Sequence, residues 1–460
     1  MKLSRTLGVR DIVLMNVTAI IGLRWISLAA ASGNTSIILW LFALVFFFLP
    51  QAFAVIELTK RYPDEGGIYV WTKESFGNFH GFISGWCYWT NNLVYFPNLM
   101  VYIAGIAVYI IGGRYLEMGE NKLYVLLFSL TAIWIVTFFN YIGLKTGKWL
   151  NNIGGLGTWL TGLVLIIFSF IALVKFGLAN PMPPGSFVNG LMNFDNFTFW
   201  AAMCFGFTGL ELASVLAGEV KDPQRSIPKA AIISGVVVAC IYILGTAALL
   251  ISLPKSEINI ISGFLQGIAA VGERIGLGWT TGLLALLITL GGIGGLMAWF
   301  TGAARIPFVA GIDKYLPRSF GKTHPKYGTP HIAILIQALI ASALIIMSFT
   351  GSTVEEAYLI LLDTTILVYF IPYLYMFSAY FILGKSSKRA DQPDRKRTFH
   401  NPLSQILAVS GFLTTLIAMI TTLIPPEESG NAVLYEIKVI GGFMLFFVTG
   451  GVIYYTKTKK

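Results

Sequence analysis

The sequence predicts an all-α polytopic membrane protein with 12 transmembrane helices, on three observations. Of its 460 residues, 56% are hydrophobic and 12% are charged, whereas soluble domains carry about 25% charged residues. Its apolar stretches are long enough to cross a hydrocarbon layer about 30 Å thick at about 1.5 Å per helical residue. The 48 glycines let such helices pack closely. The expected spans lie near residues 12–32, 37–58, 82–111, 123–142, 152–174, 197–217, 229–252, 279–304, 331–349, 356–383, 405–424 and 434–455.

The first span carries a charged residue in its middle. This residue, Arg24, costs about 3 kcal/mol or more at that depth unless a carboxylate, water or a bound anion accompanies it. Gly22 precedes it, and glycine is where a membrane helix most easily opens its backbone. Secondary transporters build substrate sites from helices broken in this way. The sequence predicts a break near Gly22–Arg24, with Arg24 either lining a substrate site or locking two helices together.

The segments around the second and seventh spans contain helix-ending and helix-starting signals. Glu57, at the end of the second span, is expected to cap that helix or to pair with Lys60 or Arg61. The stretch 62–86 combines proline, paired glycines and aromatic residues, which is typical of a helix lying along the membrane surface. Pro228 is placed to start the seventh span, because proline is tolerated in the first helical turn.

The sixth span repeats the pattern of the first. Gly206 and Gly209 lie at its middle and Glu211 follows them, which predicts a second break, although such glycines also serve in helix packing. Spans one and six are five apart, so corresponding helices of two five-helix units cross the membrane in opposite directions. This arrangement indicates an inverted repeat. We expect a first five-helix repeat at 1–176, a second at 177–385, and transmembrane helices 11 and 12 at 386–460.

The basic residues predict the orientation of the chain. Of the 32 lysines and arginines, 25 fall in segments on the side of the N-terminus and five on the other side, while Arg24 and Lys438 lie within spans. Cytoplasmic loops carry an excess of basic residues, so both termini are expected in the cytoplasm and the protein in the cell membrane. The net charge of +10 is thus an orientation signal, and no nucleic-acid partner is expected.

The sequence contains no pattern that predicts an enzyme. The three cysteines, Cys87, Cys204 and Cys240, fall within apolar spans and have no metal-site or disulfide spacing. No glycine-rich loop ending in Lys-Ser or Lys-Thr appears, so ATP is not expected to drive the protein. We expect no catalytic residues, no metal and no cofactor.

Several stretches resemble one family of transporters. The sequences FGFTGLELASVLAGEVKDPQRSIPKA at 205–230, VIELTKRYPDEGGIYVWTKESFG at 55–77 and IPYLYMFSAYFILGK at 371–385 are similar to signatures of the amino acid–polyamine–organocation superfamily. The stretches SLPKSEINIISGFLQ and IPPEESGN look closest to its glutamate/GABA antiporter branch. The resemblance extends over essentially the whole chain.

The resemblance implies a LeuT-like fold, in which two inverted five-helix repeats contain broken helices 1 and 6. In this family the substrate carboxylate meets backbone N–H groups of helix 1, and its amino group meets carbonyl groups of helix 6, as the helix dipole favours. Helix 3 contributes polar side chains. Carried over to this chain, the substrate-binding residues are Ile21, Gly22, Leu23, Arg24, Trp25, Ile26, Asn92, Tyr95, Phe205, Gly206, Phe207 and Gly209.

The chain departs from the family pattern in two places. Leu23, Arg24 and Trp25 place bulk where family members have small residues. Arg24 therefore either binds an anion through a bidentate fork or pairs with Glu211 and narrows the site. Thr158 occupies a position in the fifth span where proton-coupled members often carry lysine.

Two buried-looking acids are candidates for coupling or ion pairing. Glu211 is either a partner of Arg24 or an acid satisfied by backbone donors, and Asp363 is either a proton carrier or a structural acid. Five aromatic residues are candidates for lining a cavity, with core packing as the alternative for each: Trp25, Tyr95, Phe205, Trp299 and Tyr369.

The predicted function is secondary-active transport of amino acids across the cytoplasmic membrane by alternating access, as a permease or an exchanger. The alternatives are a carrier of polyamines or of an anionic or decarboxylated amino acid derivative, and a non-transporting sensor with the same fold. The expected partners are a small-molecule substrate, the lipid bilayer, and a proton or counter-substrate.

Overall fold

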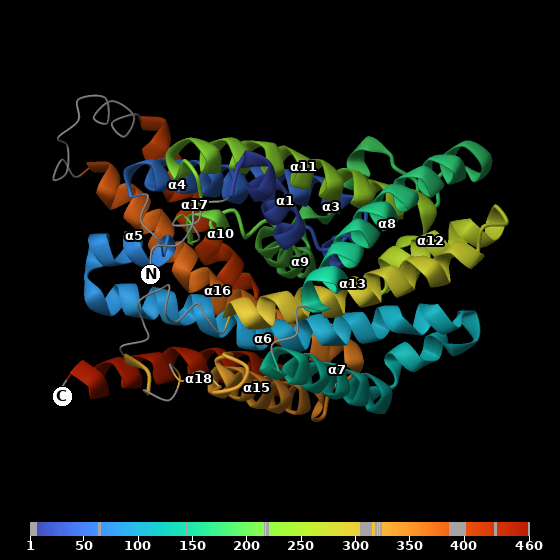
Figure 1. The fold of residues 1–460 in the computed structure, drawn as a ribbon. Helices are drawn as coiled ribbons and strands as arrows, with labels where there is room; N and C mark the ends of the chain where they lie inside the picture. Colours follow the sequence, from blue (N-terminus) through green and yellow to red (C-terminus); the bar gives the residue numbers. More distant parts are fainter. Residues whose placement is uncertain are drawn as a thin grey trace.

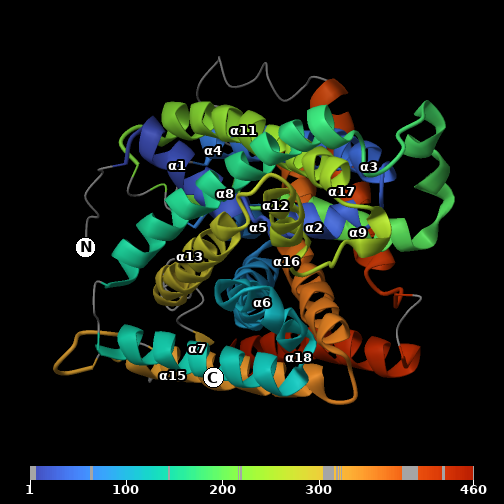
Figure 2. The same ribbon diagram turned by 90° about the vertical axis from the view of Figure 1, so that its right-hand side faces the viewer.

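The computed structural model describes residues 7–62, 66–142, 146–215, 217, 220–303, 315–317, 320, 322, 324–385, 402–426 and 430–458. Long helices run roughly along one direction of the molecule (Figure 1). Viewed along that direction, α6 lies near the centre, between the row of α7, α15 and α18 and the row of α4, α11 and α17 (Figure 2). The central helix packs along α13 and α16.

Nine continuous helices within the described residues are long and apolar enough to cross a membrane, and the bent α1–α2 pair makes a tenth. The other two expected spans correspond to α8 and to the α9–α10 pair. In chain order the spanning elements are α1 (Val9–Ile20) with α2 (Arg24–Ala30), α3 (Thr35–Ala43) with η1 (Leu44–Phe48) and α4 (Leu49–Arg61), α6 (Asn78–Ile111), α7 (Lys122–Ile142), α8 (Thr146–Phe176), α9 (Phe194–Gly206) with α10 (Leu212–Val215), α11 (Pro223–Ser252), α13 (Trp279–Ala303), α15 (His331–Phe349), α16 (Val354–Lys385), α17 (Pro402–Thr421) and α18 (Ala432–Thr458).

Shorter helices connect the spans. The helix expected before the third span is present as α5. The connecting elements are α5 (Ile68–Phe76), η2 (Gly113–Glu120), η3 (Pro184–Phe187), η4 (Asn189–Met192), η6 (Lys255–Glu257) and α12 (Gly263–Arg274).

The second span contains a π-helical turn, η1, that is explained by a proline. The N–H of Leu49 donates to the carbonyl of Leu44, five residues back, and Pro50 follows. Proline has no N–H and its ring crowds the carbonyl four residues earlier. That carbonyl, on Phe46, instead accepts a hydrogen bond of 3.2 Å from the Ser410 hydroxyl of α17. The proline thus exchanges a bond within the helix for one between helices.

Two local predictions have different outcomes. Glu57 lies 3.5 Å from Lys60 Nζ, so the predicted pair at the end of the second span is confirmed. The prediction that Pro228 starts the seventh span is wrong, because α11 begins at Pro223, directly after Asp222 at the N-cap position. Either proline fits a first turn, and the earlier one begins the helix while the later one lies inside it.

Lys438 is a buried cation of α18 that serves the end of another helix. Its ammonium group donates to the carbonyls of Ser348 (3.1 Å) and Thr350 and to the hydroxyl of Ser352 (2.8 Å). These oxygens lie at the C-terminal end of α15, where the carbonyl groups have no partner within the helix and the helix dipole is negative. The lysine therefore holds α18 against α15.

Candidate functional site

Both breaks predicted from the sequence are present. The first lies between Ile20, the end of α1, and Arg24, the start of α2, and the two axes are bent by 47°. The second lies between Gly206, the end of α9, and Leu212, the start of α10. Within it, Gly209 has a φ of 116°, which residues with a side chain rarely adopt. The predictions of broken first and sixth spans are therefore confirmed.

Tyr242 of α11 contacts both breaks. Its hydroxyl oxygen accepts a hydrogen bond from the Gly22 N–H (3.2 Å) and lies 2.6 Å from the carbonyl of Ile20 and 3.1 Å from that of Gly206. The ring stacks on Trp40, with centroids 4.7 Å apart. Because unpaired backbone groups are costly in a hydrocarbon layer, this single hydroxyl stabilises the open backbone of both helices.

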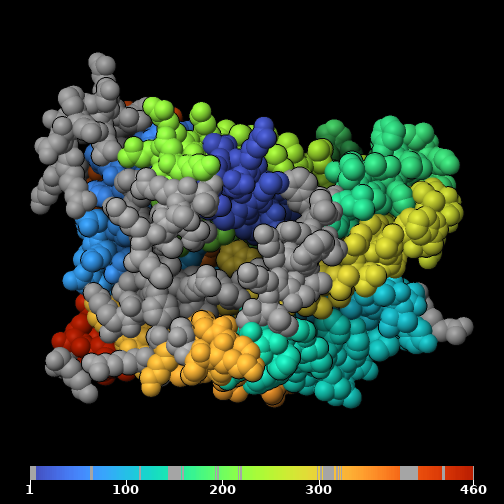
Figure 3. Space-filling view, viewed as in Figure 1, coloured from blue at the N-terminus to red at the C-terminus, as the bar shows by residue number. Residues whose placement is uncertain are grey.

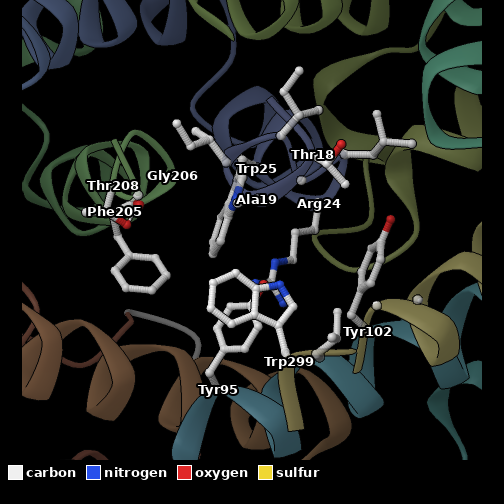
Figure 4. Close-up of a pocket in the computed structure, with 18 of the residues that line it drawn as sticks. Thr18, Ala19, Arg24, Trp25, Tyr95, Tyr102, Phe205, Gly206, Thr208 and Trp299 are labelled. Carbon is white, nitrogen blue, oxygen red and sulfur yellow. Dashed lines mark hydrogen bonds between the residues drawn. The ribbon is translucent and has the colours of Figure 1, made fainter. Parts of the chain in front are cut away.

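A cavity of about 190 Å³ lies between the two breaks, α6 and α13. The space-filling view shows the face of the molecule hollowed beside α1 (Figure 3). In the close-up, Arg24 and Trp25 point from α2 toward Tyr95, Tyr102 and Trp299 on the opposite wall (Figure 4). The cavity therefore combines one cation with an aromatic wall.

Arg24 is 2% exposed and lies in this cavity. Its Nη1 donates to Asn98 Oδ1 (3.1 Å), and Asn98 Nδ2 in turn donates to the Tyr358 carbonyl (3.0 Å), which orients the amide oxygen toward the guanidinium. The guanidinium carbon lies 4.3 Å from the ring centroid of Trp25 and 4.7 Å from that of Tyr95. Two cation–π contacts and one hydrogen bond thus hold the charge.

Glu211 is fully buried in the second break and accepts hydrogen bonds from four side chains and one backbone N–H. The closest donors are the hydroxyls of Tyr373 (2.6 Å) and Tyr369 (2.7 Å) and the backbone N–H of Gly209 (3.0 Å). The amide of Gln51 (3.3 Å) and the hydroxyl of Tyr88 (3.4 Å) complete the set. A carboxylate that is bonded in this way is stabilised without a cation.

The hypothesis that Arg24 pairs with Glu211 is wrong. Ion pairs within 4.0 Å between described residues are Lys60 with Glu57 and Arg225 with Asp222. The physical reason is that the tyrosine hydroxyls already occupy the oxygens of Glu211, while Asn98 and two aromatic rings hold Arg24. The two charges are stabilised separately, and the guanidinium remains in the cavity.

Asp363 lies outside the cavity. It is 2% exposed, on the face of α16 that packs against α18, and its Oδ2 accepts a hydrogen bond from the Tyr435 hydroxyl. The two candidate coupling acids thus occupy different places: Glu211 lies in the second break, and Asp363 lies between two helices.

Ten of the twelve predicted substrate-binding residues line the cavity: Ile21, Gly22, Leu23, Arg24, Trp25, Asn92, Tyr95, Phe205, Gly206 and Gly209. The other two pack elsewhere. Ile26 lies against Gly245 of α11, and Phe207 packs among Trp40, Phe48 and Tyr242. The five aromatic candidates, which include Trp299 and Tyr369, all line the cavity.

Sequence reasoning missed several lining residues, although a periodic signal was available for some. On α6 they recur with helical spacing around Asn92 and Tyr95, and on α13 they form a glycine-rich face next to the cavity. The missed residues are Thr18, Ala19, Ile20, Tyr88, Asn91, Leu99, Tyr102, Thr208, Leu212, Ile288, Gly291, Gly292 and Gly295. The side chain of Thr158 lies outside the described part of the structure. Within the described part, no group of three or more His, Cys, Asp or Glu side chains could hold a metal ion.

Known proteins resemble the chain over nearly its full length. A family model described as amino acid permease matches residues 7–449. An uncharacterized transporter of Legionella pneumophila is 31% identical over 449 residues, which cover 96% of this chain and 95% of that protein. A probable agmatine/putrescine antiporter of Lactococcus lactis is 23% identical over 92% of this chain and 89% of its own length. A glutamate/gamma-aminobutyrate antiporter of the same species is 22% identical over 90% and 83%.

A solved structure shares the fold. The crystal structure of MhsT in complex with L-phenylalanine superposes with a TM-score of 0.60 and covers 90% of this chain and 97% of that one, at 14% identity. At this identity the likeness establishes the fold alone. The predicted fold class, a polytopic LeuT-like helical membrane protein, is confirmed.

Proposed function

Because the chain belongs to the amino acid permease family, within the amino acid–polyamine–organocation superfamily, we propose that it works by alternating access, with its substrate bound at the two breaks. At the family level the protein is a transporter of amino acids or amines, not an enzyme. The relatives named for agmatine/putrescine and glutamate/gamma-aminobutyrate exchange support an exchanger of such compounds. The proposed location is the cell membrane, with both termini in the cytoplasm.

The observation that carries this proposal is the position of the cavity. Residues of both breaks line it, so a bound substrate contacts the two helices that alternating access requires to move. Glycine backbone makes these contacts close: a Cβ at Gly206 would lie 3.1 Å from Trp25 Cγ, and one at Gly209 would lie 3.0 Å from Ile20. The proposed moving units are the repeats 1–176 and 177–385, and 386–460 supplies the two added helices.

The two acids have different proposed roles. Glu211 connects the second break to the cavity, because its donors Tyr88 and Tyr369 also line the cavity wall. A substrate that displaces either ring alters the hydrogen bonds of the carboxylate, which is a route from occupancy to backbone conformation. Asp363 is proposed as a structural acid of the α16–α18 contact, with proton carriage as the alternative.

Transport by the purified protein in proteoliposomes tests the proposal. Vesicles preloaded with an unlabelled mixture of amino acids and amines are expected to accumulate at least one labelled member of that mixture, and protein-free vesicles are not. A screen of the same compounds by thermal unfolding identifies those that bind, because binders raise apparent stability. Comparing binding with flux then distinguishes a transporter from a sensor. Binding without flux of any compound would contradict transport and would favour the sensor.

A further inference from the structure

The cavity contains hydrogen-bond donors that lack acceptors. A guanidinium has five N–H donors, and Asn98 is the acceptor recorded for Arg24 among the described side chains. The hydroxyl of Tyr102, on the same wall, is buried and has no partner among the described residues. The guanidinium carbon lies over the rings of Trp25 and Tyr95, and the N–H groups that Asn98 does not use remain for a ligand. Two such N–H groups can bind a carboxylate in a bidentate fork.

Among the described residues, the lining of the cavity holds no negative charge to balance Arg24. None of the described residues that line it is Asp or Glu. Glu211, behind the wall, has five hydrogen-bond donors on its two oxygens, and Asp363 lies at the α18 contact. A cationic amine would therefore meet a buried positive charge of the same sign at short range, and it would have no carboxylate partner there. A diamine would meet this repulsion with two charges.

We propose that the substrate is a small carboxylate with net negative charge and that Arg24 selects it by binding its carboxylate. The inference rests on the proposed function, because it uses the same cavity. At about 190 Å³ the cavity is smaller than the pockets of about 300–1,000 Å³ that hold drug-sized ligands, so the substrate is small. The aromatic wall contacts its carbon skeleton.

Two sources share this chemistry, an acidic amino acid and a carboxylate without an amino group. Asn91 lines the cavity, and its buried Oδ1 has no hydrogen-bond donor among the described residues. This oxygen is a neutral acceptor of the kind that suits an ammonium group. Aspartate and succinate as probes distinguish the sources. Tighter binding of aspartate than of succinate would show that the amino group is also recognised. Equal binding would show that the negative charge alone determines affinity, and either result supports the proposal.

Affinity of the purified protein for a charge-graded panel is the first test. The probes are aspartate and succinate as anions, leucine and phenylalanine as zwitterions, and putrescine and agmatine as cations, each titrated by thermal shift and by competition in the vesicle flux assay. The wild-type protein is expected to bind an anion at least tenfold more tightly than any zwitterion or cation. Equal or tighter binding of leucine or putrescine would overturn the inference, even without any variant.

Variants of the cation are the second test. Arg24→Met is expected to weaken anion binding at least 100-fold, and Arg24→Lys, which keeps the charge without the fork, about tenfold. Arg274→Met removes an exposed arginine of α12 and is the matched control, with unchanged affinity. Unchanged anion affinity in Arg24→Met would contradict the inference. If the protein transports neutral amino acids alone, the proposed transport function holds and this inference fails. If anions bind in an Arg24-dependent way but no flux is found, this inference holds and the proposed transport function fails.

Discussion

The hydroxyl of Tyr242 contacts open backbone groups of two broken helices, whereas a capping side chain serves the end of one helix. Each break leaves backbone groups without the partners that a continuous helix supplies, and the hydrocarbon layer offers no water to replace them. The groups of Ile20, Gly22 and Gly206 converge on this oxygen from separate helices. A residue of the seventh span thus sets the geometry at which the first and sixth spans open.

Tyr242→Phe is expected to destabilise the protein by about 1–3 kcal/mol, the cost of leaving buried backbone groups unsatisfied. The ring and its stack on Trp40 are retained, so the loss reports the hydroxyl. The midpoint of thermal unfolding of the purified protein in detergent measures it. Tyr115→Phe, at a tyrosine that is 44% exposed, is the control and should leave the midpoint unchanged. A midpoint for Tyr242→Phe equal to that of the wild type would exclude this role.

At the scale of elements, the break between α9 and α10 depends on backbone that one residue type allows. Gly209 has a φ of 116°, and its N–H donates a hydrogen bond to the carboxylate of Glu211. The turn that follows α9 therefore also holds this carboxylate in position. Its missing side chain also lets Ile20 of α1 approach. The turn, the acid and the contact between the two breaks therefore depend on one position.

Gly209→Ala is expected to destabilise the fold by about 1–3 kcal/mol, because alanine must adopt a strained conformation. Gly441→Ala provides a control of opposite sign. Gly441 lies inside α18, and a Cβ added there would meet no atom within 4 Å, so alanine is expected to stabilise the helix by about 0.5–1 kcal/mol. Thermal unfolding of both variants under identical conditions checks the pair; equal shifts would show that local backbone strain is unimportant at Gly209.

At the scale of the whole molecule, the distribution of basic residues predicts which face of the membrane each connection occupies. Lys221 precedes α11 and Lys255 follows it, and both side chains are exposed. Because α11 is one spanning helix, the two lysines are expected on opposite faces of the membrane. The excess of basic residues predicts that the Lys221 end lies in the cytoplasm.

Single cysteines at these positions test the orientation. In a Cys240→Ala background, whose remaining cysteines are buried, an impermeant maleimide is expected to label Lys255→Cys in intact cells. Lys221→Cys should react only after the membrane is permeabilised. The reverse pattern would invert the topology and place both termini outside.

The sequence predicts the spans and breaks of this fold well, because hydrophobic length and mid-span glycines are local signals. Arg24, Gly22, Gly206 and Gly209 could be placed at the breaks for this reason. The partners of the charges could not be predicted. Asn98 lies 74 positions from Arg24, and Tyr373 lies 162 positions from Glu211. Tyrosine is common in membrane helices as core or belt, so its role as a donor becomes visible only when α16 is packed against the second break.

The contact of α18 with the preceding helices has a consequence for the autonomy of the ten-helix core. This last helix brings Lys438 to the open carbonyls of α15 and Tyr435 to the acid of α16. Without α18, these oxygen atoms of α15 and α16 would lose their hydrogen-bond donors within the bilayer. We therefore expect the ten helices that contain the cavity to depend on α18, because it supplies hydrogen-bond donors to their buried polar groups.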